Sequence, residues 1–313
     1  MSPLPLVIIN PASAGGATAD AWPRAASDLR RHFGPFNCAF TAGRGDAAAI
    51  AAREARAGRR FIVACGGDGT ISEVANGILQ SGAAAELGIL PSGTGGDFRR
   101  TLGIPTQIAE AALVLRRGRT QSVDAGRVTY MNERGEEESR FFLNVASFGM
   151  GGEVIRRVKE NDRLAVGGAA MLGGRASFAL AALQTTLTFS KPSVRVRIDE
   201  GPESQMVVTN FCVANARYFG GGMKIAPEAR LNDGLFDVVA IGDLATLSVI
   251  ANSYRVYLGT HLGMRDVRHA PARRVEAKPA AGVDVSLEVD GELVGRLPAT
   301  FEILPRALRV RCP

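Results

Sequence analysis

The sequence contains little cysteine, and its cysteines lie far apart. The four thiols among 313 residues form no CxxC pair and show no Cys/His spacing: Cys38, Cys65, Cys212 and Cys312. Such scattering argues against a disulfide framework and against a zinc site. Cys65 ends an apolar run, so we expect it to be a small core residue.

Long hydrophobic runs are also missing. No apolar stretch approaches the ~20 residues that a helix needs to cross a bilayer, and residues 1–10 lack the basic start of a signal peptide. A hydrophobic content of 46% and a charged content of 22% are typical of a globular protein. The length allows two domains. We therefore expect a two-domain cytoplasmic protein.

Aromatic residues are few, at 6%, while the net charge is +6. A nucleic-acid surface is not expected, because no aromatic residues interleave with the basic ones to form a stacking platform. Each basic cluster alone is compatible with a solvated helix face, but together they favour an anionic membrane surface or a nucleotide. The clusters are Arg99-Arg100, 116–119, 156–159 and Arg273-Arg274.

The first part of the chain alternates between strand and helix patterns. Such alternation predicts a parallel sheet with helices on both faces, which binds ligands beyond the carboxyl ends of its strands. The expected strands are 4–9, 37–41, 61–65 and 87–90, and the expected helices are 19–32, 45–58, 71–79 and 108–116.

After about residue 123 the pattern changes to short strands separated by turn residues. The expected strands are 141–146, 194–198, 207–214, 236–241, 284–289 and 301–304, and the expected helices are 164–186 and 244–258. The predicted fold class is an α/β N-terminal domain with a doubly wound, mostly parallel sheet, followed by a β-rich, sandwich-like C-terminal domain. We place these domains at residues 1–124 and 125–302, and leave open a return of 303–313 to the first.

The most informative motif is Gly66-Gly67-Asp68-Gly69-Thr70, between a predicted strand and a predicted helix. Glycines at such a turn let backbone N–H groups approach a phosphate, which the helix N-terminus also favours. A tight turn with a helix cap is the alternative. A carboxylate beside phosphates needs a cation between them, so Asp68 is a candidate Mg²⁺ ligand, directly or through water. The sequence contains no Walker loop and no protein-kinase H-R-D or D-F-G motif.

Two further loops follow predicted strands of the same sheet. One is 91–98, which contains Thr94 and Asp97, and the other is 10–16. Either loop alone is an ordinary glycine-rich turn. Because the carboxyl ends of parallel strands meet at one edge of a sheet, we expect all three loops to converge there.

These motifs resemble the diacylglycerol kinase catalytic-domain family, which includes bacterial lipid kinases and sphingosine kinases. The resemblance covers nearly the whole chain and rests on Asn10-Pro11, Thr41, GGDGTISE (66–73), GTGGDF (93–98), FGGGMKIAP (219–227), NDGLFD (232–237) and DGE (290–292). GGDGT alone is shared with NAD kinases and, more loosely, phosphofructokinases. The later motifs favour the lipid kinases. Three positions depart from the family pattern, namely Ala14, Ser72 and Gly96, where Gly, Asn and Asn are usual.

The resemblance implies a set of ligand contacts. Contacts to ATP would come from Asn10, Pro11, Ala12, Ser13, Ala14, Gly15, Thr41, Gly66, Gly67, Asp68, Gly69, Thr70, Ile71, Ser72 and Thr94. Asp68, Asp97 and Asp124 would surround the catalytic Mg²⁺. Asp233, with the carbonyls of Arg230 and Leu235, would hold a second, structural metal. From the residues alone, an ordinary turn is the favoured interpretation of 232–234.

The Asp290-Gly291 pair between two apolar runs predicts a β-hairpin turn. The resemblance further implies that Glu292 is a general base with Asp290 nearby. A lipid hydroxyl needs such a base, because it is a poor nucleophile until its proton is accepted.

The predicted activity is ATP- and Mg²⁺-dependent transfer of phosphate to a lipid hydroxyl, by an enzyme that associates peripherally with the membrane. Two other hypotheses are an NAD kinase-like enzyme and a non-catalytic nucleotide- or lipid-binding regulator. The acceptor lipid is left open, as is a homodimer. The stretch 164–187 is either an amphipathic helix on the sheet or a wall of an acyl-chain pocket.

Overall fold

A computed structural model describes residues 3–93, 95–164, 184–185, 188–280 and 282–313. Thr94 and nearly all of the predicted helix 164–186 lie outside the described residues. The chain divides into two compact units. Unit 1 comprises Met1–Ala125, Leu231–Gly234 and Leu304–Pro313, and unit 2 comprises Gly126–Arg230 and Leu235–Ile303.

Unit 1 contains a parallel sheet in the order β2-β1-β3-β4-β15. Its strands are β1 (Leu6–Ile9), β2 (Asn37–Phe40), β3 (Phe61–Gly66), β4 (Glu86–Pro91) and the end of β15 (Glu292–Cys312). The inner strands are apolar and buried along almost their whole length, as expected for a parallel strand covered on both faces.

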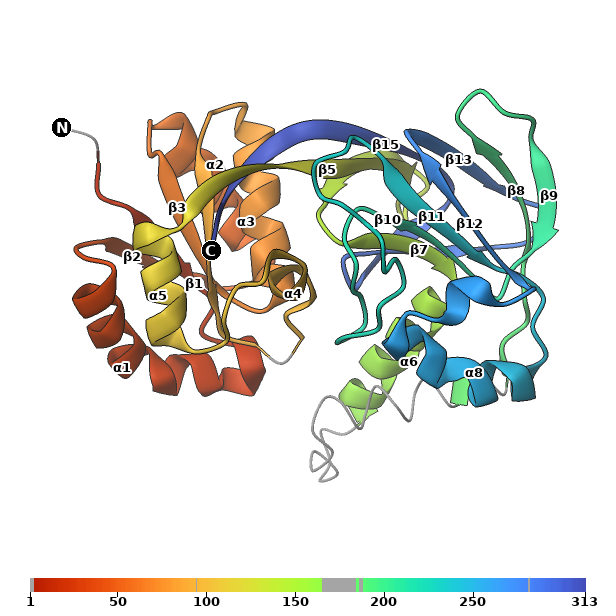
Figure 1. The fold of residues 1–313 in the computed structure, drawn as a ribbon, viewed down its shortest axis with the longest axis horizontal. Helices are drawn as coiled ribbons and strands as arrows, with labels where there is room; N and C mark the ends of the chain where they lie inside the picture. Colours follow the sequence, from red (N-terminus) through yellow and green to blue (C-terminus); the bar gives the residue numbers. More distant parts are fainter. Residues whose placement is uncertain (1–2, 94, 165–183, 186–187, 281) are drawn as a thin grey trace. The chain divides into compact units, whose positions relative to one another are not determined.

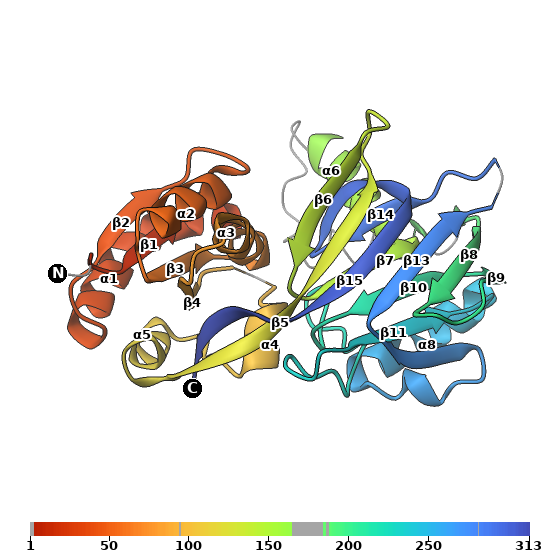
Figure 2. The same cartoon turned by 90° about the horizontal axis from the view of Figure 1, so that it is seen from above.

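Helices cover both faces of this sheet (Figure 2). They are α1 (Ala17–His32), α2 (Asp46–Arg56), α3 (Asp68–Ser81) and α5 (Ile108–Arg117), with the short α4 (Asp97–Leu102) and the 3-10 turn η1 (Ser13–Gly16) in the loops. α2 packs on α3, and α1 packs on α5. The α2–α3 contact is close because Gly77 has no side chain: a Cβ there would lie 2.3 Å from the Ala48 carbonyl oxygen.

Unit 2 is a sandwich of antiparallel strands (Figure 1). One layer has the order β12-β11-β10-β7-β14-β15, and the other pairs β9 with β8, β8 with β13, β13 with β15, β15 with β5, and β5 with β6. The strands are β5 (Arg119–Met131), β6 (Glu137–Phe142), β7 (Val145–Gly149), β8 (Ser193–Ile198), β9 (Ser204–Val207), β10 (Asn210–Ala214), β11 (Phe236–Ile241), β12 (Val267–Ala272), β13 (Arg274–Pro279) and β14 (Ser286–Val289). The apolar core includes stacked phenylalanines, with the rings of Phe148 and Phe211 4.8 Å apart.

The predicted fold class is confirmed, but two predicted strands are wrong in their continuity. The strand expected at 141–146 is divided between β6 and β7, because Leu143 and Asn144 donate their N–H groups to the Asp290 carboxylate instead of a strand partner. The strand expected at 207–214 is divided between β9 and β10, because the Val208 N–H bonds the Pro192 carbonyl. Local hydrophobicity could not show either break.

β15 is much longer than the predicted strand 301–304. It runs for 21 residues, pairing with β14, then β13, and finally in parallel with β4. The Arg311 guanidinium bonds the Glu86 carboxylate at 2.7 Å, which ties the end of β15 to β4. The sequence did not predict β5, β12 or β13 either.

Unit 2 also contains helices outside its sheets. They are α6 (Met150–Leu164), α8 (Thr246–Leu258) and the 3-10 turn η3 (His261–Gly263). α8 was predicted at 244–258, whereas α6 and the short α4 of unit 1 were not predicted. None of the helices in the described part of the chain is long and apolar enough to span a membrane.

Candidate active site

The structure brings together the three glycine-rich loops of unit 1. The Asn10 N–H donates to the Cys65 carbonyl at 3.0 Å, and the Asn10 side-chain amide donates to Thr70 Oγ1 at 3.1 Å. The Ser92 N–H donates to the Gly66 carbonyl at 3.0 Å. The loops after β1, β3 and β4 therefore form one connected surface at the carboxyl ends of the strands, where such sheets bind ligands.

The close approach of two of these loops depends on missing side chains. A Cβ on Gly93 would lie 2.6 Å from the Gly67 Cα, and a Cβ on Gly66 would lie 2.4 Å from Thr70 Oγ1. α3 begins directly after Gly67, which provides no side-chain cap, so its first N–H groups lack partners within the helix. A cavity of about 60 Å³ opens beside them, lined by Gly66, Gly67, Ile71, Pro91, Gly93, Gly96, Arg99 and Thr106.

Asp68 fastens the second loop to the third. Its carboxylate accepts hydrogen bonds from the N–H groups of Gly96 at 2.6 Å and Phe98 at 3.3 Å. A Cβ on Gly95 would lie 2.5 Å from Asp68 Oδ2, so only glycine fits there without displacement. An ionised carboxylate offers about four acceptor sites, so these two bonds leave Asp68 able to bind a water molecule or a cation.

Arg99 contributes a positive charge to the same cavity, which the sequence reasoning had placed in a basic cluster only. Burial and the neighbouring Arg100 lower the pKa of Arg99, whereas Asp68 and Asp97 raise it. Its guanidinium also donates to the Ile104 carbonyl at 3.1 Å. A guanidinium held beside the N-terminus of a helix is suited to bind phosphate oxygens.

Asp97 and Asp124 both make hydrogen bonds in unit 1. Asp97 is buried, and its carboxylate accepts from Arg100 at 2.8 Å. Asp124 is fully buried and accepts from the N–H groups of Gly234 at 2.7 Å and Arg306 at 2.6 Å. Asp124 thus holds both late segments of unit 1, 231–234 and 304–313, against β5.

No group of three His, Cys, Asp or Glu side chains in the described ranges is placed to ligate one metal ion directly. Asp68, Asp97 and Asp124 would therefore bind an ion only with water molecules among its ligands. The carboxylates are the oxygen donors that Mg²⁺ prefers, and Mg²⁺ in proteins commonly keeps several waters. Asp68 and Asp97, whose charges both act on Arg99, fit that cation in this form, whereas both carboxylate oxygens of Asp124 already accept backbone N–H groups.

The loop predicted to form the second metal site comprises residues 230–235. The Leu231 carbonyl accepts the Asp124 N–H at 2.6 Å, and Gly234 takes a left-handed conformation with φ of 73°. Asp124 therefore fixes this loop from within unit 1. Binding of a second metal by Arg230, Asp233 and Leu235 stays a prediction.

The loop after β1 has an unusual backbone. Ala14, Gly15 and Gly16 follow one another with φ of 55°, 67° and 95°. Ala14 lies where the family usually has glycine, and a left-handed alanine costs about 1–2 kcal/mol. Successive N–H groups in such conformations can surround an anion.

Glu73 is a positioning residue that the sequence reasoning missed. Its carboxylate accepts from the N–H groups of Gly45 at 2.9 Å and Ala47 at 3.1 Å, so a residue of α3 caps α2. The Thr41 N–H bonds the Ile9 carbonyl at 2.9 Å, which fixes the start of the same loop. The signal was available, because Glu73 ends the motif GGDGTISE.

In unit 2, β14 and β15 form the predicted hairpin. Its turn residues Asp290 and Gly291 have φ of 50° and 84°, as a type I′ turn requires. The Asp290 carboxylate accepts from the backbone of Leu143 at 3.0 Å and Asn144 at 2.8 Å. Glu292 bonds the Arg140 guanidinium at 3.1 Å, and its side chain is 25% exposed. Asp290 thus stabilises the turn, and Glu292 is held in place but remains accessible.

Glu288 is a buried carboxyl group at this hairpin that was predicted only as part of a strand. It accepts from Ser147 Oγ at 2.5 Å and from the Gly291 N–H at 2.6 Å. Burial raises the pKa of Glu288 to about 7, the charge of Asp290 acts in the same direction, and the two hydrogen bonds oppose the shift. Its position between Leu287 and Val289, both in the core, was the only signal in the sequence.

We predict that Glu288 makes folding stability depend on pH. Because its pKa in the folded protein lies above the ordinary value of 4.5, its contribution to stability is full below that value and is lost as the pH rises through 7. When the pH is raised from 5 to 8, the wild type should therefore lose about 2 kcal/mol of unfolding free energy that the variant Glu288→Gln keeps. Urea unfolding at both pH values measures this difference, with Glu302→Gln, whose side chain is 29% exposed, as the control. A constant difference would contradict the prediction.

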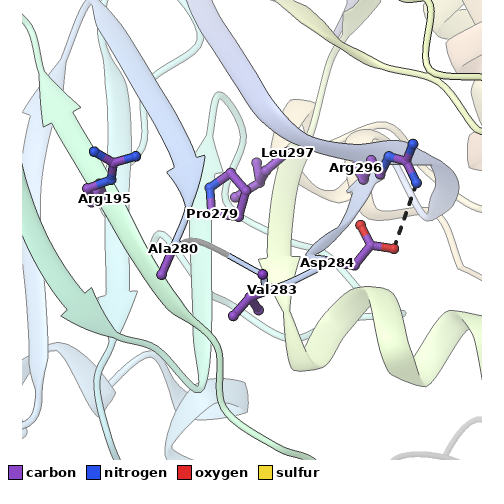
Figure 3. A pocket seen from close by; sticks show the side chains of 8 residues that line it. Arg195, Pro279, Ala280, Val283, Asp284, Arg296 and Leu297 are labelled. Atoms are coloured by element: carbon purple, nitrogen blue, oxygen red, sulfur yellow. Dashed lines mark ion pairs between the residues drawn. The ribbon is translucent and has the colours of Figure 1, made fainter.

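A shallow hollow of about 520 Å³ lies elsewhere in unit 2 (Figure 3). It contains none of the predicted site residues and is lined by Arg195, Pro279, Ala280, Gly282, Val283, Asp284, Arg296 and Leu297. Arg296 and Asp284 form an ion pair of 4.0 Å across it. The hollow lies by the start of β14, and Asp290 follows the other end of that strand.

The glycine loops on a parallel sheet, followed by a β-sandwich, define a two-domain phosphotransferase. Residues 5–128 match the diacylglycerol kinase catalytic domain, and residues 145–312 match the YegS C-terminal NAD kinase beta sandwich-like domain. The chain therefore belongs to the family of diacylglycerol kinases and YegS-like lipid kinases. It is a lipid kinase that phosphorylates an alcohol group, and family membership implies that it uses ATP. The resemblance and the enzyme class predicted from the motifs are confirmed.

Two curated relatives and a crystal structure illustrate the similarity. "Probable lipid kinase YegS-like" of Pseudomonas aeruginosa strain PAO1 is 34% identical, over 86% of this chain and 82% of that protein. The diacylglycerol kinase of Bacillus subtilis strain 168 is 30% identical, over 86% of this chain and 83% of that protein. A crystal structure of a diacylglycerol kinase from Bacillus anthracis has a TM-score of 0.71 at 21% identity, covering 99% of this chain and 97% of that chain. The crystal structure shows the same fold.

Proposed function

We propose that the protein transfers the γ-phosphate of ATP, with Mg²⁺, to a hydroxyl group of a diacylglycerol-like lipid at an anionic membrane surface. The observation that carries this proposal is the connected surface of three glycine-rich loops in unit 1, with Asp68 and Arg99 beside the start of α3. Lipid kinases among the relatives support the class of acceptor.

The three loops would bind the triphosphate through backbone N–H groups. The start of α3 and Arg99 provide positive potential for the phosphate oxygens. Asn10, Thr41 and the left-handed run after β1 would complete the nucleotide site, with Thr94 outside the described residues. Asp68, Asp97 and Asp124 would hold Mg²⁺ through water, and the bound ion offsets phosphate charge.

Glu292 would act as the general base. Its carboxylate would accept the proton of the lipid hydroxyl as the oxygen attacks the γ-phosphorus and the bond to ADP breaks. Arg140 orients the carboxylate, and Asp290 and Glu288 hold the turn that presents it. Asp233 and the carbonyls of Arg230 and Leu235 are proposed to bind a second, structural metal.

The test is a phosphate-transfer screen across a total lipid extract with ATP labelled at the γ-phosphate. We expect Mg²⁺-dependent label in one class of chloroform-soluble product, whose acceptor is then identified by mass spectrometry. A parallel reaction with NAD tests the dinucleotide hypothesis. Label in the phosphorylated dinucleotide, with none in lipid, would overturn the proposed function.

A further inference from the structure

α8 has its apolar side facing the solvent. This 13-residue helix contains no buried residue. Its exposed side chains include Leu247 at 79%, Leu258 at 66%, Tyr254 at 55%, Tyr257 at 53% and Ile250 at 39%. These five are half of the ten exposed large hydrophobic side chains in the described part of the chain, so they do not represent ordinary scatter.

The spacing places these side chains on one face of the helix. Positions 247, 250, 254, 257 and 258 follow the helical period, and only Ser253 adds a polar side chain to the exposed positions between them. More polar groups lie on the less exposed side, where Asn252 donates to the Ser248 carbonyl at 2.8 Å. A surface helix of a soluble protein normally has the opposite polarity.

Contacts near its C-terminal end hold α8 in place. Val256 packs against an apolar cluster of unit 2 that includes Ile225, and its carbonyl accepts the Lys224 N–H at 2.9 Å. Gly259, with φ of 74°, ends the helix and leads to the buried His261. The helix is therefore attached to the sandwich while its apolar face points outward.

The charge around this face suits an anionic surface. The sequence contains no acidic residue between Asp243 and Asp266, while Arg255 and Arg265 lie in that stretch. Lys224 lies against the end of the helix, since a Cβ on Gly259 would be 3.2 Å from its Cδ. Leucine and tyrosine side chains bordered by basic ones are typical of helices that lie in the headgroup region of a membrane.

We propose that α8 is the membrane-docking helix of this kinase, with the five apolar side chains entering an anionic bilayer and the basic residues facing its headgroups. The inference rests on the proposed function, because the lipid acceptor resides in that bilayer. A second copy of the chain is less suited to cover the apolar face of α8. A helix of this length and width presents roughly 200 Å², whereas a stable interface buries about 800 Å² per partner.

The experiment uses co-sedimentation to compare how strongly the wild type and two variants bind vesicles made of phosphatidylglycerol and phosphatidylcholine. We expect the variant Leu247→Ser/Tyr254→Ser/Leu258→Ser to partition at least tenfold more weakly than the wild type. The control Leu4→Ser/Leu113→Ser/Val283→Ser removes three exposed large apolar side chains elsewhere, with exposed fractions of 44%, 38% and 37%, and should stay within twofold. Because all six side chains are exposed, both variants should keep the unfolding temperature of the wild type.

The outcomes separate this inference from the proposed function. Unchanged vesicle binding by the α8 variant would overturn the docking role, as would a wild-type dimer that the variant dissociates in a vesicle-free sedimentation run. Phosphorylation of lipid dispersed in detergent should be equal in the wild type and the α8 variant. If neither protein phosphorylated lipid but vesicle binding still depended on α8, the proposed function would fail while the docking helix stood.

Discussion

Replacement of Glu292 by glutamine is expected to lower kcat by about two to four orders of magnitude, the usual contribution of a positioned general base. The amide keeps the size of the side chain and can still accept a bond from Arg140, but it cannot take the proton of the lipid hydroxyl. ATP binding should be unchanged, because the residues proposed to contact the nucleotide lie in unit 1. Steady-state phosphate transfer and calorimetric titration with ATP measure the two effects.

A matched control for this variant lies on the same strand. Glu302 of β15 is also ion-paired with arginines, at 2.6 Å to Arg127 and 2.7 Å to Arg274, and its side chain is 29% exposed. Glu302→Gln should retain wild-type kcat. Near-normal turnover in Glu292→Gln would remove Glu292 from its proposed role.

Replacement of Asp68 by alanine is expected to abolish Mg²⁺-dependent turnover, with a loss of at least about a thousandfold if charge stabilisation at the phosphates fails. The same change leaves the N–H groups of Gly96 and Phe98 without their acceptor, at a cost to stability of about 1–3 kcal/mol. The loop after β4 would then lose its attachment to α3. Rates measured across a Mg²⁺ titration, together with urea unfolding, separate the two losses.

Asp199 offers a control for the structural part of this effect. Its carboxylate also accepts two backbone N–H groups, from Arg273 and Arg274, each at 2.8 Å, but it belongs to a turn of unit 2. Asp199→Ala should reduce stability while retaining turnover and its Mg²⁺ dependence. Unchanged Mg²⁺ dependence in Asp68→Ala would count against Asp68 as part of the metal site.

The elements of unit 1 were predicted well because each depends on a short stretch of sequence. Strands and helices of the parallel sheet alternate within short stretches, each with its own hydrophobic period and glycine turn. The glycine loops follow their strands, so their position at one sheet edge could be predicted from the fold class alone. Arg99 and Glu73 were missed as site residues because their roles depend on which atoms the folded loops bring near them.

Unit 2 was harder to predict because its structure depends on distant pairings. The break between β6 and β7 is caused by Asp290, about 147 positions from Leu143. The partners of Asp124 lie 110 and 182 positions away, at Gly234 and Arg306. β15 contains Pro298 and Pro305, which local rules treat as interruptions of a strand. No local pattern carries this information.

The path of β15 also has a consequence for biosynthesis. Domains encoded first generally fold first as the chain leaves the ribosome. Here β4, in the parallel sheet of unit 1, lacks its neighbour β15 until Arg309 and Val310 have been translated, because those residues make the parallel pairing. The unit encoded first is therefore completed late in synthesis, and a nascent chain stalled before Arg309 would expose an open edge beside β4.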